Sequence, residues 1–189
     1  MSVSDSLLAI DPGVRLHGWC VLARAEGGAW EPVRWGHDES EVVLREIQAS
    51  DLVVVETPAG YAYSAARVRG LLDAAGAAGE FRGVARASGA RAVPCSAETW
   101  RAALTGSAHP DDAAIQTALE RQALAGRLTR LPTTARKLEL SHVLDACGLG
   151  LVTGLRGADW VEAREAERRG ATTRQAKLPG LGTKRRARR

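Results

Sequence analysis

Leu-Leu-Ala-Ile-Asp-Pro-Gly at residues 7–13 is the segment from which we predict the fold of this 189-residue chain. Residues 7–10 form a short apolar run that is typical of a buried strand, and Asp11 follows it directly. Pro12-Gly13 then favours a tight turn, which leaves the carboxylate of Asp11 at the rim of a sheet. The apolar pattern resumes at residues 18–22, so the two runs predict the first two strands of a meander.

The pattern after this opening is typical of an α/β domain. A third strand at residues 29–35 completes the meander after the turn at Gly27-Gly28. Further strands are predicted at 51–56 and 91–94, and helices at 40–47, 63–87, from 96, from 110 to 125 and from 140 to 151. We therefore expect a mixed five-stranded sheet, a three-strand antiparallel meander plus parallel strands, flanked by helices.

Length and composition set the limits of the architecture. The chain is long enough for one α/β domain, which we place at residues 1–157, followed by a charged helix and a basic flexible tail at 158–189. It has no run of 18 apolar residues, and its first residues do not resemble a signal peptide. The three cysteines are far apart in apolar segments, which favours buried thiols in a reducing cytoplasm.

The charge is unevenly distributed along the chain. Nine of the 26 basic residues lie in residues 168–189, which contain no acidic residue, so the rest of the chain has 17 basic against 22 acidic residues. The body is therefore mildly acidic and the tail strongly basic. We interpret the tail, with Lys184, Arg185 and Arg186, as an arm that contacts DNA phosphates; a solvated terminus without a specific role is the alternative.

Four residues at the edges of the predicted elements carry the chemistry that we expect. Asp11 and Glu56 each end a strand, and His142 and Asp145 lie three apart, on one face of the last core helix. Carboxylate oxygens suit Mg²⁺ or Mn²⁺, and a histidine favours tolerance of Mn²⁺. Two such ions about 4 Å apart can bind the attacking water and the leaving oxygen of a phosphodiester. Taken singly, each residue also fits a turn, a cap or a surface pair.

Several motifs together resemble the RuvC-type Holliday junction resolvases of the RNase H-like nuclease superfamily. The matching segments are residues 8–13 with Gly18, residues 53–56 ending at Glu56, Leu-Thr-Gly at 104–106, and Ser-His-Val-Leu-Asp-Ala at 141–146. They follow the order of the family and span about residues 7–154.

The resemblance implies an RNase H-like fold and a crossover junction endodeoxyribonuclease that works as a homodimer. Its partner would be branched DNA, a four-way junction that it resolves by paired symmetric nicks in DNA recombination and repair. Asp11, Glu56, His142 and Asp145 would be the catalytic residues and would hold two Mg²⁺ or Mn²⁺ ions per site. We expect a cytoplasmic protein encoded by a bacterium or a phage.

The sequence departs from the family pattern in three places. His142 stands where many members have Asp and some have His, so the resemblance still implies catalysis but leaves the preferred metal open. The aromatic residue that usually follows the second acid is missing, and Tyr61 or Tyr63 would substitute for it unless they pack against the core. Asp112 occupies the place of a lysine that meets phosphate, which predicts weak or altered activity unless His109, Arg101 or Arg121 compensates; each of these also fits a solvated helix surface.

Basic residues on the helix at 63–87 are candidates for contacts with the DNA backbone. They are Arg67, Arg69, Arg82 and Arg86, and the alternative is a charged solvent face. Two other functions remain open. The chain could be a catalytically weak or inactive junction-binding or DNA-binding protein of the same fold, or a YqgF-like nuclease that acts on structured RNA.

Removal of the residues after Arg169 tests the role that we assign to the tail. The truncated protein should bind DNA more weakly and with a flatter dependence on salt, because seven basic residues are lost, while any preference for junctions should remain. Fluorescence anisotropy at several salt concentrations measures both. An unchanged salt slope would contradict the prediction.

Overall fold

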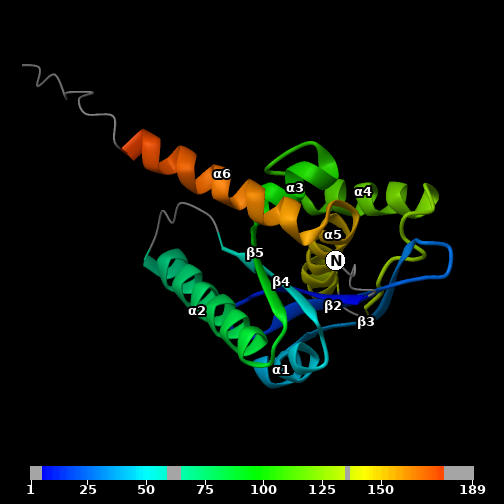
Figure 1. The fold of residues 1–189 in the computed structure, drawn as a ribbon, viewed down its shortest axis with the longest axis horizontal. Coiled ribbons are helices and arrows are strands. Elements are labelled where there is room, and N and C mark those ends of the chain that lie inside the picture. The colour runs from blue at the N-terminus through cyan, green and yellow to red at the C-terminus, as the bar shows by residue number, and fades with distance from the viewer. Residues whose placement is uncertain (1–5, 59–64, 135–136, 177–189) are drawn as a thin grey trace, which may run out of the picture.

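The computed structural model describes residues 6–58, 65–134 and 137–176. They form a five-stranded sheet and six helices (Figure 1). The strands are β1 (Ser6–Asp11), β2 (His17–Arg24), β3 (Trp30–Asp38), β4 (Leu52–Thr57) and β5 (Arg91–Ser96). The helices are α1 (Ser40–Gln48), α2 (Ala65–Ala87), α3 (Ala97–Thr105), α4 (Asp112–Leu124), α5 (Lys137–Arg156) and α6 (Ala158–Ala176).

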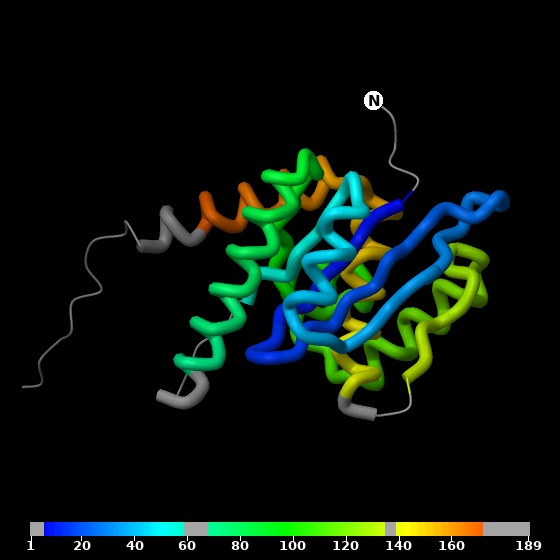
Figure 2. The backbone as a smooth tube through the Cα atoms, turned by 90° about the horizontal axis from the view of Figure 1, so that it is seen from below, coloured from blue at the N-terminus to red at the C-terminus, as the bar shows by residue number. Residues whose placement is uncertain are grey.

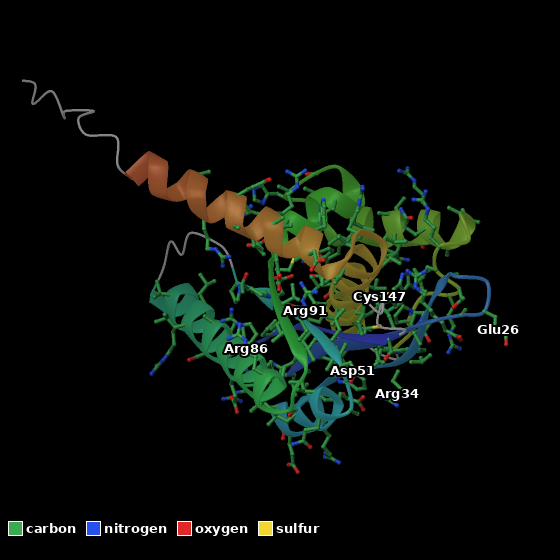
Figure 3. All side chains as sticks on the ribbon, in the orientation of Figure 1. Glu26, Arg34, Asp51, Arg86, Arg91 and Cys147 are labelled. Atoms are coloured by element: carbon green, nitrogen blue, oxygen red, sulfur yellow. The ribbon has the colours of Figure 1, made fainter. Side chains whose placement is uncertain are left out.

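The sheet has the order β3-β2-β1-β4-β5. β1, β2 and β3 form an antiparallel meander, whereas β4 pairs in parallel with β1 and β5 pairs in parallel with β4. The β2–β3 hairpin projects on the side away from α2 (Figure 2), with Glu26 near its tip (Figure 3). The expected mixed sheet of five strands is confirmed.

Helices cover both faces of the sheet (Figure 1). Successive residues of each strand point to opposite faces, and both faces carry apolar side chains that the helices bury. Leu8, Ile10 and Val53 belong to the apolar cluster beneath α1 and α2. Ala9 and Val54 belong to the cluster on the other face, which α5 covers together with parts of α3, α4 and α6. The direction in which each strand residue points is thus fixed by its place in the alternation.

Helix α5 lies unusually close to β1 and β2. An alanine methyl group at Gly18 would overlap the backbone carbonyl oxygen of His142 and lie 2.6 Å from its carbonyl carbon. One at Gly150 would overlap a methyl group of Leu22 and lie 3.0 Å from Cβ of Ala9. Glycines on both the sheet and the helix therefore permit this close approach.

Helix α6 is joined to the sheet edge through polar contacts. Oε1 of the buried Glu165 accepts hydrogen bonds from the backbone N–H of Ser96 (3.0 Å), from its hydroxyl (2.8 Å) and from the hydroxyl of Thr99 (2.6 Å). Arg91, at the start of β5, lies beneath α6 (Figure 3) and donates to Glu162 at 2.9 Å. The boundary that we predict at residue 157 coincides with the start of α6, and the division into two parts stays a prediction.

Two further findings concern the cysteines and the length of the helices. Cys20, Cys95 and Cys147 are buried and free, as expected from their apolar surroundings. Within the described ranges, no helix has the length and apolar character needed to cross a membrane.

Substitution of Gly18 by alanine tests the close approach of α5. Gly18→Ala should lower the free energy of unfolding by about 1–3 kcal/mol, because the added methyl group meets backbone atoms that cannot rotate away. Urea denaturation followed by circular dichroism measures the change. Gly27→Ala is the matched control, since a methyl group there meets nothing within 4 Å. Equal stability of the two variants would contradict the prediction.

Candidate active site at the ends of β1 and β4

The two strand acids lie side by side at one edge of the sheet. Asp11 is the last residue of β1 and Glu56 the second-last residue of β4. These strands are parallel neighbours with Ile10 opposite Val55, so the next residue of each strand reaches the same edge. Asp11 directly follows Ile10, and Glu56 directly follows Val55, two residues that point toward α2. Because successive strand residues point to opposite faces, the two carboxylates face α5. Each is only 8% exposed.

Helix α5 brings the other two predicted residues to this edge. Nδ1 of His142 lies 2.7 Å from Oδ2 of Asp11, which joins the helix to the end of β1. This hydrogen bond raises the pKa of His142, while burial opposes the increase. Asp145, one helical turn later, accepts a hydrogen bond of 2.8 Å from the guanidinium of Arg101 on α3. The side chains of His142 and Asp145 therefore face the strand acids.

Glu56 is held by a buried tryptophan. Nε1 of Trp100 donates to Oε2 of Glu56 at 2.7 Å. Burial raises the pKa of Glu56 to about 8, with a further contribution from the nearby charge of Asp11, and the Trp100 hydrogen bond opposes both. Without an added positive charge, Glu56 therefore keeps its proton at neutral pH.

Asp145 shows the same effect in weaker form. Burial raises its pKa to about 7, the charge of Asp11 adds to the increase, and Arg101 opposes it. Asp112, at the start of α4, raises it slightly further. Three carboxylates thus compete for too little positive charge, which is the electrostatic condition that favours a divalent cation.

The donor set suits a hard divalent cation, although its present arrangement is not that of a complete site. Three carboxylates and one imidazole offer the oxygen-rich ligands that Mg²⁺ and Mn²⁺ prefer. Among the residues that the structure describes, however, no three His, Cys, Asp or Glu side chains form a metal-binding cluster. Asp11, Glu56 and Asp145 are each turned toward a protein donor instead. The chemistry of the residues fits a cation, and binding requires them to exchange these partners.

Two neighbours of the site were not found by sequence reasoning. The ring of His37, on β3, stacks on His142 with centroids 4.9 Å apart and planes within 9°. Burial and the neighbouring His142 lower the pKa of His37, so it packs as a neutral ring. Trp100 is the other. Neither residue has a local motif that marks it, because each meets the site only through contacts between distant segments.

The structure separates the residues that we predict to bind DNA. Arg101 lies at the site, where it pairs with Asp145. Arg82 and Arg86 are one turn apart on α2, whereas Arg69 lies about 140° away from Arg82 around the helix axis. Arg69 and Arg86 are exposed, and Nε of Arg82 donates to the carbonyl oxygen of Ala78. The other predicted contacts, namely Tyr61, Tyr63, the side chain of Arg67, Lys184, Arg185 and Arg186, lie outside the described residues.

Comparison with known proteins identifies the fold. No family model matches the sequence, and no curated protein matches it. The structure is similar to that of Thermus thermophilus RuvC in complex with a Holliday junction substrate, with a TM-score of 0.56 and 16% identity over 82% of this chain and 96% of that chain. A second structure of Thermus thermophilus RuvC gives 0.51 and 19% over 81% of this chain and 97% of that one.

A mitochondrial protein has the same architecture. The yeast mitochondrial Holliday junction resolvase Ydc2 is similar with a TM-score of 0.59 and 9% identity, over 91% of this chain and 86% of that one. The chain therefore has an RNase H-like fold, the fold of these Holliday junction resolvases, and the expected fold class is confirmed.

The raised pKa of Glu56 predicts a particular dependence of stability on pH. A carboxyl group whose pKa is higher in the folded than in the unfolded protein favours folding at low pH, and this contribution is lost as the pH rises from its ordinary value of 4.5 to about 8. Wild-type protein in EDTA should therefore lose more stability than Glu56→Gln between about pH 5 and pH 8.

Urea denaturation at several pH values measures this difference. Glutamine retains an oxygen that can accept the Trp100 hydrogen bond, so the variant chiefly removes the ionisation. Glu120→Gln, on the exposed side of α4, is the control and should follow the wild type. Parallel curves for wild type and Glu56→Gln would contradict the prediction.

Proposed function

We propose that this protein is a divalent-metal-dependent endonuclease that cleaves four-way DNA junctions by paired symmetric nicks. The observation that carries the proposal is the convergence of Asp11, Glu56, His142 and Asp145 at one edge of an RNase H-like sheet. Structures with this fold include a RuvC that holds a Holliday junction substrate. The spacing of the four residues along the chain, which resembles the RuvC-type pattern, supports the same reading.

Asp11, Glu56, Asp145 and His142 are the residues that would hold Mg²⁺ or Mn²⁺. A bound cation would supply Lewis-acid stabilisation of the negative charge that develops on the phosphodiester. The protein side chains have their own tasks around it. In the cation-free protein Asp11 orients the His142 ring through Nδ1, and Trp100 orients the carboxylate of Glu56, so these contacts hold the four residues near one another before a cation binds. Loss of the Glu56 proton on cation binding would make the reaction faster at higher pH.

Arg101 is suited to contact the scissile phosphate. Its guanidinium lies beside Asp145, with the group about a quarter exposed. An arginine that is released from Asp145 can donate to phosphate oxygens, so Arg101 would supply positive charge where Asp112 cannot. Arg101 would thus replace the positive charge that is lost because Asp112 occupies the place of a lysine.

Paired nicks imply a two-fold arrangement. A four-way junction has two strands of like polarity that are cut at equivalent positions, and one copy of this chain has one such site. A homodimer with a two-fold axis would place two sites across the junction. We therefore propose the homodimer as the active unit, with a role in DNA recombination and repair.

Incubation with labelled four-way junction, linear duplex and structured RNA, with Mg²⁺ or Mn²⁺, tests the function. We expect symmetric nicks in the junction, reduced roughly a hundredfold or more in Asp11→Asn because one charged group of a preorganised site is lost. Asp51→Asn changes an exposed acid that directly precedes β4, at the end of the strand opposite Glu56; it is the matched control and should cleave normally. Mn²⁺ should also raise the Tm of wild type and Asp51→Asn but not of Asp11→Asn.

Each other result points elsewhere. Junction binding without cleavage in either metal would contradict an endonuclease and indicate a binding protein of the same fold. Cleavage of RNA with all DNA substrates intact would indicate a nuclease for structured RNA.

A further inference from the structure

A cavity of about 390 Å³ lies between α4 and α5, directly beside Asp145. Its volume falls in the range of about 300–1,000 Å³ that is usual for pockets that hold small organic ligands. The cavity is lined by Asp112, Ile115, Gln116, Leu140, Ser141, Leu144 and Asp145. Because Asp145 belongs to both, the cavity is continuous with the candidate active site.

The walls of the cavity are apolar. Ile115, Leu140 and Leu144 come from the two helices and provide aliphatic surface on both sides. A flat ring can be enclosed between such walls, since aromatic faces make good contact with aliphatic side chains.

The polar groups of the cavity are mainly hydrogen-bond acceptors. Asp112 and Gln116 lie one turn apart on the same face of α4. The side-chain nitrogen of Gln116 donates one hydrogen to Glu120 at 3.0 Å, and its amide oxygen can accept while its second N–H can still donate. Asp112 adds an exposed carboxylate that can accept from N–H donors, whereas Asp145 already accepts from Arg101.

We propose that this cavity takes an unstacked nucleobase next to the scissile phosphate, and that Asp112 selects a base with an exocyclic amino group over thymine. The inference rests on the proposed endonuclease function and adds a specificity determinant to it. Guanine, cytosine and adenine each carry an amino group that a carboxylate can accept from, whereas thymine presents carbonyl oxygens on both sides of its single ring N–H. Enzymes that act on single bases hold the unstacked base in a pocket between apolar or aromatic side chains, and the walls of this cavity offer such a pocket.

The position of Asp112 supports a role in reading bases. It is exposed at the start of α4, where it does not cap the helix: Asp111 is the N-cap, and its side chain accepts from the backbone N–H of Ala114 at 2.8 Å. Asp112 is therefore free of that structural task. A carboxylate in this place cannot bind the phosphate itself, which leaves the neighbouring base as the part of the strand that it can recognise.

The proposal is tested with a panel of junctions that differ in one base next to the mapped cut site. The base on the 5′ side of the cut is varied first, and then the base on the 3′ side. Wild type should cleave the junctions with guanine, cytosine or adenine roughly fivefold or more faster than the junction with thymine, the scale of one base-reading hydrogen bond. Asp112→Asn should reduce this preference to less than about twofold, because an amide can donate as well as accept.

Asp111→Asn is the matched control. It removes the same charge from the same turn of α4, and asparagine retains the N-cap, so folding and overall affinity for DNA should change equally in the two variants. The base preference should remain in Asp111→Asn. Equal cleavage of all four junctions by wild type, or an unchanged preference in Asp112→Asn, would overturn the proposal. If Asp112→Asn instead changed the metal concentration needed for cleavage by the same factor for all four bases, the base pocket would be refuted and Asp112 would belong to a cation subsite.

A binding measurement separates this proposal from the endonuclease function. 2-Aminopurine placed at successive positions around the crossover should brighten at one position when wild-type protein binds in EDTA, because unstacking increases its fluorescence. Brightening without cleavage in any metal would retain the base pocket and refute the nuclease. Cleavage without brightening at the flanking position would retain the nuclease and refute the base pocket.

Discussion

The close approach of α5 to β1 and β2 is the constraint on which the site depends. Gly18 lies opposite Asp11 across the β1–β2 pair, and the backbone of His142 rests against it. Gly150 permits the same proximity two turns later, against Leu22 and Ala9. With larger residues at these places the helix would stand away from the sheet, and the His142–Asp11 hydrogen bond would be lost. A contact between backbones thus sets the distance between the candidate site residues on β1 and α5.

Burial of several carboxylates in one place makes the site electrostatically incomplete. Asp11, Glu56 and Asp145 each have one protein partner, yet burial still raises the pKa values of Glu56 and Asp145. The partners come from two helices: His142 from α5, and Trp100 and Arg101 from α3. A divalent cation in such a group of acids would favour their ionised forms, and the metal binding that we propose would therefore release protons.

Helix α6 is connected to this site although it lies at the edge of the sheet. Glu165 accepts three hydrogen bonds from Ser96 and Thr99, at the start of α3. The next two residues of α3 are Trp100 and Arg101, which hold Glu56 and Asp145. The orientation of α3 therefore couples α6 to the carboxylates. Helix α6, which we place outside the α/β domain in the sequence analysis, therefore helps to position Trp100 and Arg101.

Local sequence patterns predict the strands of the sheet, the face to which each strand residue points, and four candidate site residues that stay a prediction. Alternation of apolar residues around Asp11 and Glu56 decides which side of the sheet they face, and the spacing of three between His142 and Asp145 decides that they share a helix face; both follow from local backbone geometry. Tertiary structure alone decided that His37 stacks on His142, that Trp100 donates to Glu56, and that a cavity opens beside Asp112. These depend on how far α3, α4 and α5 stand from the sheet and from one another. That distance results from interlocking of side chains across the whole core, for which no local pattern exists.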